Sequence, residues 1–421
     1  GLLNLKGVEK IRDVQKLAIE KPRLGIPLIF GMDVVHGYET IFPIPLGLSC
    51  SWDMDAIRKS ARIAATEASA DGISWTFSPM VDISRDPRWG RGQETYGEDP
   101  YLTGQMGMAV VRGLQGPEGE KYDKLHACAK HYAVHSGPEW NRHSFNAENI
   151  DPRDLWETYL PAFKNLVQKA HVKEVMCAYN RFEGEPCCGS NRLLMQILRD
   201  EWGYKEIVVS DCWAISDFYN KGAHETDPDK QHASAKAVLS GTDVECGDSY
   251  ASLPEAVKEG LIDEKQIDIS LKRLMKARFE LGEMDEPSQV SWAQIPYSVV
   301  DSKEHRELAL RMARESLVLL QNNQSLLPLN KNLKVAVVGP NANDSVMQWG
   351  NYNGFPSHTI TLLEGIREYL PESQIIYEPG CDLTSDVTLQ SVFQQCSMDG
   401  KQGFSAKYWN NTKQEGTPDA T

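Results

Sequence analysis

The feature that most constrains the fold is the alternation of short apolar runs with amphipathic helical segments along the first two-thirds of this 421-residue chain. Such alternation is typical of a parallel α/β fold, because each helix returns the chain to begin the next strand beside the previous one. The runs expected to form strands are residues Gly1–Asn4, Ile26–Phe30, Ile73–Phe77, Ala127–Ala129, Val175–Ala178, Ile207–Val209 and Thr242–Val244.

The alternation of apolar runs and helical segments stops after residue 285, which predicts a domain boundary there. Residues 1–285 form the first predicted domain, and the polar, proline-containing residues 286–300 are a predicted linker. A second αβ unit is expected over residues 301–401, with helices at Ser302–Leu320 and Leu362–Leu370. Residues 402–421 are predicted to open a separate β module.

Composition excludes several classes of function. The formal net charge of −15 argues against nucleic-acid binding, which needs a basic footprint. No apolar run approaches the ~20 residues that a membrane-spanning helix requires, so membrane insertion is not expected. The nine cysteines have no zinc-type spacing and are expected to be buried thiols or an occasional bridge. Neither a metal nor an organic cofactor is predicted.

Polar and ionisable residues follow the apolar runs, where a TIM barrel or an open α/β sheet places its active site. Asp211 follows Ile207–Ser210 directly, so a buried strand would hold its carboxylate rigidly. The alternative is that Asp211 caps the next helix. Lys130 and His131 are adjacent and would point to opposite faces of a plain strand, so they can serve one ligand only if the backbone bends there. A Schiff-base role for Lys130 stays open.

Five motifs taken together strongly resemble glycoside hydrolase family 3. They occur in order across residues 1–400: Gly31-Met-Asp-Val-Val-His-Gly37, Asp86-Pro-Arg-Trp-Gly-Arg91, Lys130-His131, Val175-Met-Cys-Ala-Tyr-Asn180 and Val209-Ser-Asp211. The resemblance implies a TIM-type (β/α) barrel followed by an α/β sandwich domain. It also implies an oligosaccharide substrate and a periplasmic or secreted location. The oligomeric state is left unknown.

The resemblance assigns a role to each candidate residue. Asp211 would be the nucleophile of a retaining exo-β-glycosidase, with Tyr179 close to it. The residues that would bind the sugar are Asp33, Arg91, Lys130, His131, Arg142, Tyr179 and Trp213. In a retaining enzyme a second carboxylic acid lies ~5–5.5 Å from the nucleophile. The family's glucosidase branch takes this acid/base from a Glu in the second domain. Because residues 402–421 resemble the start of a protective-antigen-type β-sandwich insert, the acid/base is expected beyond Thr421.

The residues also bear on which family branch and sugar the chain fits. The N-acetylglucosaminidase branch uses a His–Asp pair, but here Asn141 stands at the position of that Asp, so His143 is expected to lack an orienting carboxylate. Asp33 favours a β-glucosidase, because its short side chain leaves room for a hydroxymethyl group. The segments Arg91–Glu94 and Arg142–Asn146 resemble those of β-xylosidases, which is the alternative. A lyase and a non-catalytic carbohydrate-binding protein are more distant alternatives.

Overall fold

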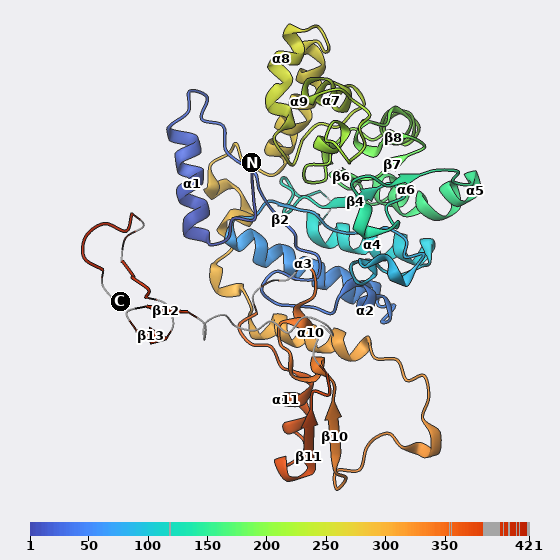
Figure 1. The fold of residues 1–421 in the computed structure, drawn as a ribbon, viewed down its shortest axis with the longest axis vertical. Coiled ribbons are helices and arrows are strands. Elements are labelled where there is room, and N and C mark those ends of the chain that lie inside the picture. Colours follow the sequence, from blue (N-terminus) through green and yellow to red (C-terminus); the bar gives the residue numbers. More distant parts are fainter. Residues whose placement is uncertain are drawn as a thin grey trace. The chain divides into compact units, whose positions relative to one another are not determined.

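The computed structural model describes residues 1–117, 119–352, 354, 356–381, 396–398, 400–402, 405–409, 411 and 413–418. The chain divides into two compact units (Figure 1). The first comprises Gly1–Pro328 with Ser345–Thr359, and the second comprises Leu329–Asp344 with Ile360–Thr421.

The main strands of the first unit are parallel and neighbour one another in chain order. They are β1 (Leu2–Leu3), β2 (Phe30–Met32), β3 (Trp75–Thr76), β4 (Cys128–Tyr132), β6 (Glu174–Cys177) and β9 (Ile207–Ser210). Two sheets, β1-β2-β3 and β4-β6-β9, are linked by parallel bridges from Trp75 to His126 and from Met80 to Lys130. A further bridge joins Val209 to Val244. The predicted α/β class is confirmed.

One predicted strand is displaced along the sequence. Residues Ile26–Phe30 were expected to form it, but β2 begins at Phe30 and continues to Met32. Pro27 cannot donate a backbone hydrogen bond, which disfavours ladder pairing at that position. The displacement brings the end of β2 directly to Asp33.

Helices alternate with these strands. They are α1 (Val8–Glu20), α2 (Pro45–Ser49), α3 (Met54–Asp71), α4 (Pro100–Gln115), α5 (Pro152–Asp154), α6 (Pro161–Gln168), α7 (Lys230–Leu239), α8 (Leu253–Lys258), α9 (Glu264–Glu280) and α10 (Lys303–Glu315), with π-type helices at Leu155–Tyr159 and Asn191–Glu201. Asp53 caps α3 by accepting a hydrogen bond from the backbone N–H of Ala56, and Gly72 ends that helix at a φ of 95°. Figure 1 shows α3 and α4 on one side of the strands and α7, α8 and α9 on another. Apolar side chains from α3, α4, α6 and the strands share one core.

Helix α10 is shorter than predicted. The sequence favoured a helix over Ser302–Leu320, but α10 ends at Glu315. Leu317, Val318, Leu319 and Leu320 are exposed, so extending the helix would bury no apolar face. Without such burial, added helical turns gain little stability.

The second unit is a small αβ arrangement. Strands β10 (Val335–Val338) and β11 (Ile375–Glu378) pair in parallel, and α11 (Leu362–Arg367) begins with a capping box between Thr361 and Glu364. Strands β12 (Ser397–Met398) and β13 (Lys401–Gln402) form an antiparallel pair. Of the module predicted at 402–421, residues 403–404, 410, 412 and 419–421 lie outside the described residues.

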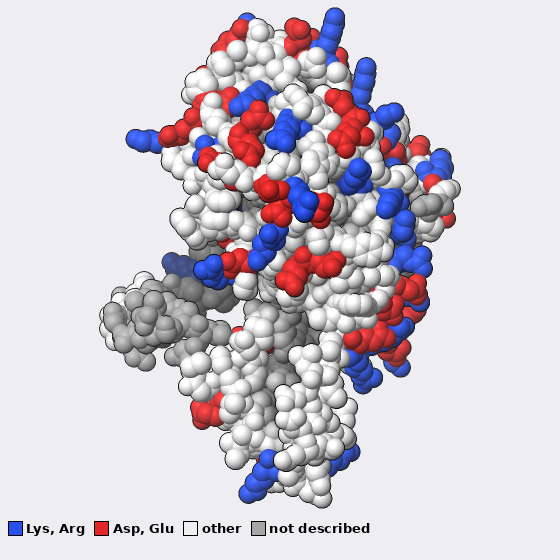
Figure 2. Space-filling model, turned by 90° about the vertical axis from the view of Figure 1, so that its right-hand side faces the viewer, with Lys and Arg blue, Asp and Glu red and all other residues white. Residues whose placement is uncertain are grey.

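Two surface properties bear on function. Within the described residues, helices are too short or too polar to cross a bilayer. On the face shown in Figure 2, Lys and Arg side chains are interspersed with Asp and Glu.

Candidate active site

Asp211 lies at the end of β9, as the sequence predicted. Its Oδ1 accepts a hydrogen bond of 2.8 Å from the backbone N–H of Cys212. Its Oδ2 is buried and has no hydrogen-bond partner among the described residues, although it lies 3.5 Å from Nε2 of His131. Burial raises the pKa of Asp211, while the positive charges of Arg91 and Lys130 oppose that rise. The backbone therefore holds one carboxylate oxygen, and the other lies beside the imidazole of His131.

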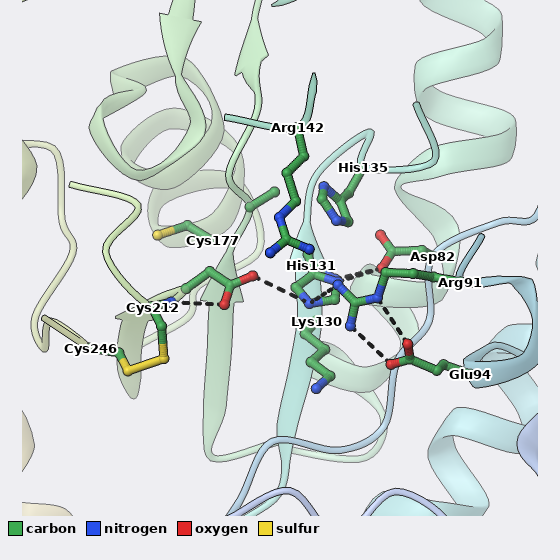
Figure 3. Close-up of polar contacts among 12 residues, drawn as sticks. Asp82, Arg91, Glu94, Lys130, His131, His135, Arg142, Cys177, Cys212 and Cys246 are labelled. Atoms are coloured by element: carbon green, nitrogen blue, oxygen red, sulfur yellow. Dashed lines mark hydrogen bonds and ion pairs between the residues drawn. A yellow bond between two sulfur atoms is a disulfide. The ribbon is translucent and has the colours of Figure 1, made fainter. Parts of the chain in front are cut away.

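Lys130 and His131 contribute to the same site, because β4 is irregular at that point. The register between β4 and β6 shifts between Ala129 and Tyr132. Lys130 Nζ donates to Asp33 Oδ1 at 2.8 Å, and His131 Nε2 faces Asp211. Figure 3 shows both side chains in one group with Arg91. The backbone irregularity that the sequence analysis required is present.

Asp82 positions His131, a role that the sequence analysis did not assign to it. One Asp82 oxygen lies 2.8 Å from Nδ1 of His131 and 3.0 Å from its backbone nitrogen. Burial and the charge of Arg91 lower the pKa of His131 well below its ordinary value, so its imidazole is neutral. Burial raises the pKa of Asp82 to about 7. A proton on Nδ1 of His131 leaves Nε2 as an acceptor facing the Asp211 carboxylate.

Arg91 is held in a fixed orientation beside this imidazole. Its Nε and Nη2 donate to the two oxygens of Glu94 at 3.0 and 2.9 Å, a bidentate pair. Its Nη1 lies 3.4 Å from Nε2 of His131 (Figure 3). Glu94 therefore serves as the partner of Arg91.

Arg142 and Tyr179 come together through a small sheet. Strands β5 (Asn146–Ala147), β7 (Arg181–Phe182) and β8 (Glu185–Pro186) tie the segment after β4 to the segment after β6. The guanidinium carbon of Arg142 lies 4.9 Å from the Tyr179 ring centroid. Burial and the neighbouring Asp211 carboxylate raise the pKa of Tyr179. Tyr179 therefore lies next to both Arg142 and Asp211.

Trp213 follows Asp211 by two residues and is 60% exposed. Its backbone N–H donates to the carbonyl of Cys246, and Cys212 forms a disulfide with Cys246. A second disulfide joins Cys177 and Cys188. The sequence contained a signal for the Cys212–Cys246 disulfide, because each of these cysteines follows shortly after one of two neighbouring strand segments.

Tyr352 is a further aromatic residue at the site, and the sequence analysis missed it. Lys130 Nζ lies 4.8 Å from the centroid of its ring. Burial raises the pKa of the Tyr352 phenol, and Lys130 opposes the rise. The surrounding segment, residues 345–359, has no periodic pattern, so nothing in the sequence connected it to the strand ends.

The prediction that His143 lacks an orienting carboxylate, made because Asn141 replaces an acidic residue, was wrong. In the structure Asp217 supplies one, and its Oδ2 lies 2.8 Å from Nδ1 of His143. Asp217 is distant in sequence and carries no motif, so spacing alone could not identify it.

A separate cluster has ligand types suited to a metal ion. Asp123, His126 and Glu280 bring their ligand atoms within 4.8 Å of one another. The ammonium group of Lys173 lies 2.9 Å from Asp123 and 3.0 Å from Glu280. A lysine thus already balances the charge of these two carboxylates.

Sequence comparison decides the family. The profile described as "Glycosyl hydrolase family 3 N terminal domain" matches residues 2–277, and that of the family's C-terminal domain matches residues 317–419. The chain belongs to glycoside hydrolase family 3. The family resemblance drawn from the five motifs is thus confirmed.

Relatives of this family 3 chain include enzymes named for two different sugars. It is 51% identical to a xylan 1,4-beta-xylosidase of Xylanibacter ruminicola, over 95% of this chain and 49% of the relative. It is 36% identical to a periplasmic beta-glucosidase of Salmonella typhimurium, over 92% of this chain and 51% of the relative. The chain thus spans about half the length of these curated relatives.

Similar solved structures also include both beta-glucosidases and a beta-xylosidase. A mutant beta-glucosidase of Listeria innocua in complex with laminaribiose matches with a TM-score of 0.82 at 34% identity, over 89% of this chain and 52% of that one. A family 3 exo-beta-xylosidase bound to a xylobiose aziridine probe matches with a TM-score of 0.80 at 31% identity, over 90% of this chain and 51% of that one. The mixed α/β family 3 fold is thereby supported.

Proposed function

We propose that the protein is a retaining exo-acting β-glycosidase whose nucleophile is Asp211. The observation that carries the proposal is the buried Oδ2 of Asp211, which has no hydrogen-bond partner among the described residues while Oδ1 is held by a backbone N–H. A carboxylate held in this way can form a covalent glycosyl intermediate. The positive charges of Arg91 and Lys130 favour its ionised, nucleophilic form.

The reaction would proceed by double displacement. Asp211 Oδ2 bonds to the anomeric carbon as the glycosidic bond breaks, and an acid delivers a proton to the leaving oxygen. The same group, now a base, takes a proton from water, which attacks the anomeric carbon and releases Asp211. We infer that this acid/base is a Glu beyond Thr421.

The polar groups around Asp211 suit a sugar ring. Asp33 would bind hydroxyls far from the scissile bond, and Arg91, Lys130 and His131 the remaining ring hydroxyls. Neutral His131, with Nε2 as an acceptor, can take a hydrogen bond from a hydroxyl lying beside the nucleophile. Arg142, Tyr179 and the exposed face of Trp213 would complete the pocket.

We favour glucose as the released sugar because Asp33 is short. The Asp33 carboxylate contacts Lys130. β-Xylosidases usually carry a longer Glu at this position, and the space that the extra length of Glu would fill is left here for a hydroxymethyl group. The alternative, a β-xylosidase, is supported by the relative at 51% identity. The lyase alternative is disfavoured: burial alone would lower the pKa of Lys130, but Asp33 outweighs it and raises that pKa, whereas a Schiff-base lysine must lose its proton.

We also propose that residues 1–285 form a TIM-type (β/α) barrel. Strands that neighbour one another in chain order support a TIM-type barrel. We retain the boundaries 1–285, 286–300 and 301–401, and a protective-antigen-type insert beginning at 402. A periplasmic or secreted location agrees with the name of the Salmonella relative.

The test compares aryl β-glucoside and aryl β-xyloside turnover in the full-length protein that contains this chain. Wild-type protein should prefer the glucoside, and Asp33→Glu should shift the kcat/KM ratio toward the xyloside. Asp211→Asn should abolish both activities, whereas Asp248→Asn, which changes an exposed carboxylate, should not. Preference for the xyloside would select the β-xylosidase alternative. Sugar binding without any turnover would indicate a non-catalytic carbohydrate-binding protein.

A further inference from the structure

His143 lies between a carboxylate and a guanidinium group at the edge of the candidate site. Its Nδ1 is 2.8 Å from Oδ2 of Asp217, and Nε of Arg142 donates to its Nε2 at 3.2 Å. Asp217 belongs to the short turn Ser216–Phe218 that follows Asp211. The three side chains therefore connect the segment after β9 to the segment after β4.

The chemistry of the two partners fixes the tautomer of the imidazole. A guanidinium group can only donate hydrogen bonds, so Nε2 of His143 must accept one and carries no proton. The proton is then on Nδ1, where the Asp217 carboxylate accepts it. The opposite tautomer would place a proton on Nε2 against Arg142 and leave Nδ1 without one against Asp217.

Arg142 is in turn held over Tyr179. Its Nη1 donates to a carboxylate oxygen of Glu139, and its guanidinium carbon lies 4.9 Å from the Tyr179 ring centroid. The His143 ring contacts the same aromatic ring, with centroids 4.7 Å apart. His224 holds the other side of this residue, with Nε2 2.7 Å from the Tyr179 carbonyl oxygen.

Tyr179 neighbours the Asp211 carboxylate, so the position of Arg142 affects the sugar site directly. Arg142 has two anchors, and the one through His143 exists only in a single tautomer. If that anchor is lost, the long side chain regains rotamer freedom. It must then give up that freedom again when substrate binds, which weakens binding.

We propose that Asp217 fixes His143 in the Nδ1-protonated tautomer, and that His143 thereby acts as a positioning residue that holds Arg142 over Tyr179 for substrate binding. The inference rests on the proposed glycosidase function, because it assigns Arg142 to the sugar site. It assigns His143 no part in proton transfer.

Substitutions in the full-length protein test the tautomer. In Asp217→Asn the amide can accept from Nδ1–H through its oxygen or donate to Nδ1 through its N–H₂, so it no longer excludes the tautomer that cannot accept from Arg142. We expect KM for an aryl β-glucoside to rise about tenfold, while kcat changes less than about twofold. The tenfold figure corresponds to the loss of one hydrogen bond to a charged group. His143→Gln keeps an acceptor oxygen, so its KM should stay close to the wild-type value. His143→Phe has no acceptor, so its KM should rise as in Asp217→Asn.

A matched control separates the effect from a general loss of a His–Asp pair. His232 also lies 2.8 Å from an aspartate, Asp229, at the surface, and His232→Gln should leave KM unchanged. Combining Asp217→Asn with Arg142→Lys should raise KM no further than Arg142→Lys alone, because both changes remove the same contact. Melting temperatures identify any variant that fails to fold.

Three results would overturn the inference. Additive effects of the Asp217 and Arg142 substitutions would show that Asp217 does not act through Arg142. Unchanged KM in His143→Phe would show that the anchor is not needed. A large fall in kcat in His143→Gln that azide restores would make His143 a proton donor instead. A wild-type protein that hydrolyses no β-glycoside would refute the proposed function itself, which is a distinguishable outcome.

Discussion

The imidazole of His126 gives a prediction whose size can be worked out from the structure. It is buried between Glu174 and Asp123, with Nδ1 and Nε2 each 3.3 Å from a carboxylate oxygen. Burial alone would lower the pKa of His126, but the two carboxylates outweigh it and raise that pKa to about 9. Compared with the ordinary value of 6.5, the shift corresponds to about 3 kcal/mol of stability.

The sign follows from proton binding. The folded state holds the proton more tightly than the unfolded chain, so the contribution is complete below pH ~6.5 and disappears as the pH rises through about 9. About 2 kcal/mol should be lost between pH ~7 and pH ~9. Burial also raises the pKa of Glu174 to about 7. The resulting loss of stability with rising pH occurs mainly below pH ~7, outside the range compared here.

The assay is urea denaturation followed by tryptophan fluorescence at both pH values. The free energy of unfolding of wild-type protein should fall by about 2 kcal/mol more than that of His126→Gln over this window. The control His232→Gln, which alters an exposed His–Asp pair, should behave as wild type. An equal fall in wild type and His126→Gln would refute the assignment of a buried imidazolium.

Three further predictions concern stability and activity. Asp243 is buried and accepts hydrogen bonds from two arginines, so Asp243→Ala should lower the free energy of unfolding by about 3–5 kcal/mol in urea titrations; a change below about 1 kcal/mol would contradict this. Replacing Cys212 and Cys246 by serine opens a loop with a sequence separation of 34 residues and should cost up to about 4 kcal/mol, measured against the Cys50→Ser control; equal stability of the two proteins would count against the bridge. Because burial raises the pKa of Asp211 and the nucleophile must be ionised, the acid limb of kcat/KM should lie above the ordinary aspartate pKa of 3.8; a limb below that value would contradict the assignment.

Much of the site could be predicted because strand ends are readable in the sequence. An apolar run followed by a polar residue places Asp33, Lys130 and Asp211 at one edge of a parallel sheet, and the structure brings these residues together. The family motifs added the roles of Arg91 and Tyr179, which position after an apolar run does not specify.

The rest depended on contacts between segments distant in sequence. The pairing of Asp217 with His143 joins residues 74 positions apart, and Tyr352 reaches Lys130 from an aperiodic segment. Helix α10 ended early because the apolar residues after Glu315 find no core to bury them. Local pattern does not report such tertiary contacts.

Asp211 Oδ2 is the atom that we expect to form the covalent glycosyl intermediate. The most direct measurement treats the full-length protein with an activated 2-fluoro β-glucoside, digests it and locates the added mass by mass spectrometry. We expect one 2-fluoroglucosyl group on the peptide containing Asp211, and none in Asp211→Asn. Stoichiometric label on a different carboxylate, with Asp211 unmodified, would contradict it.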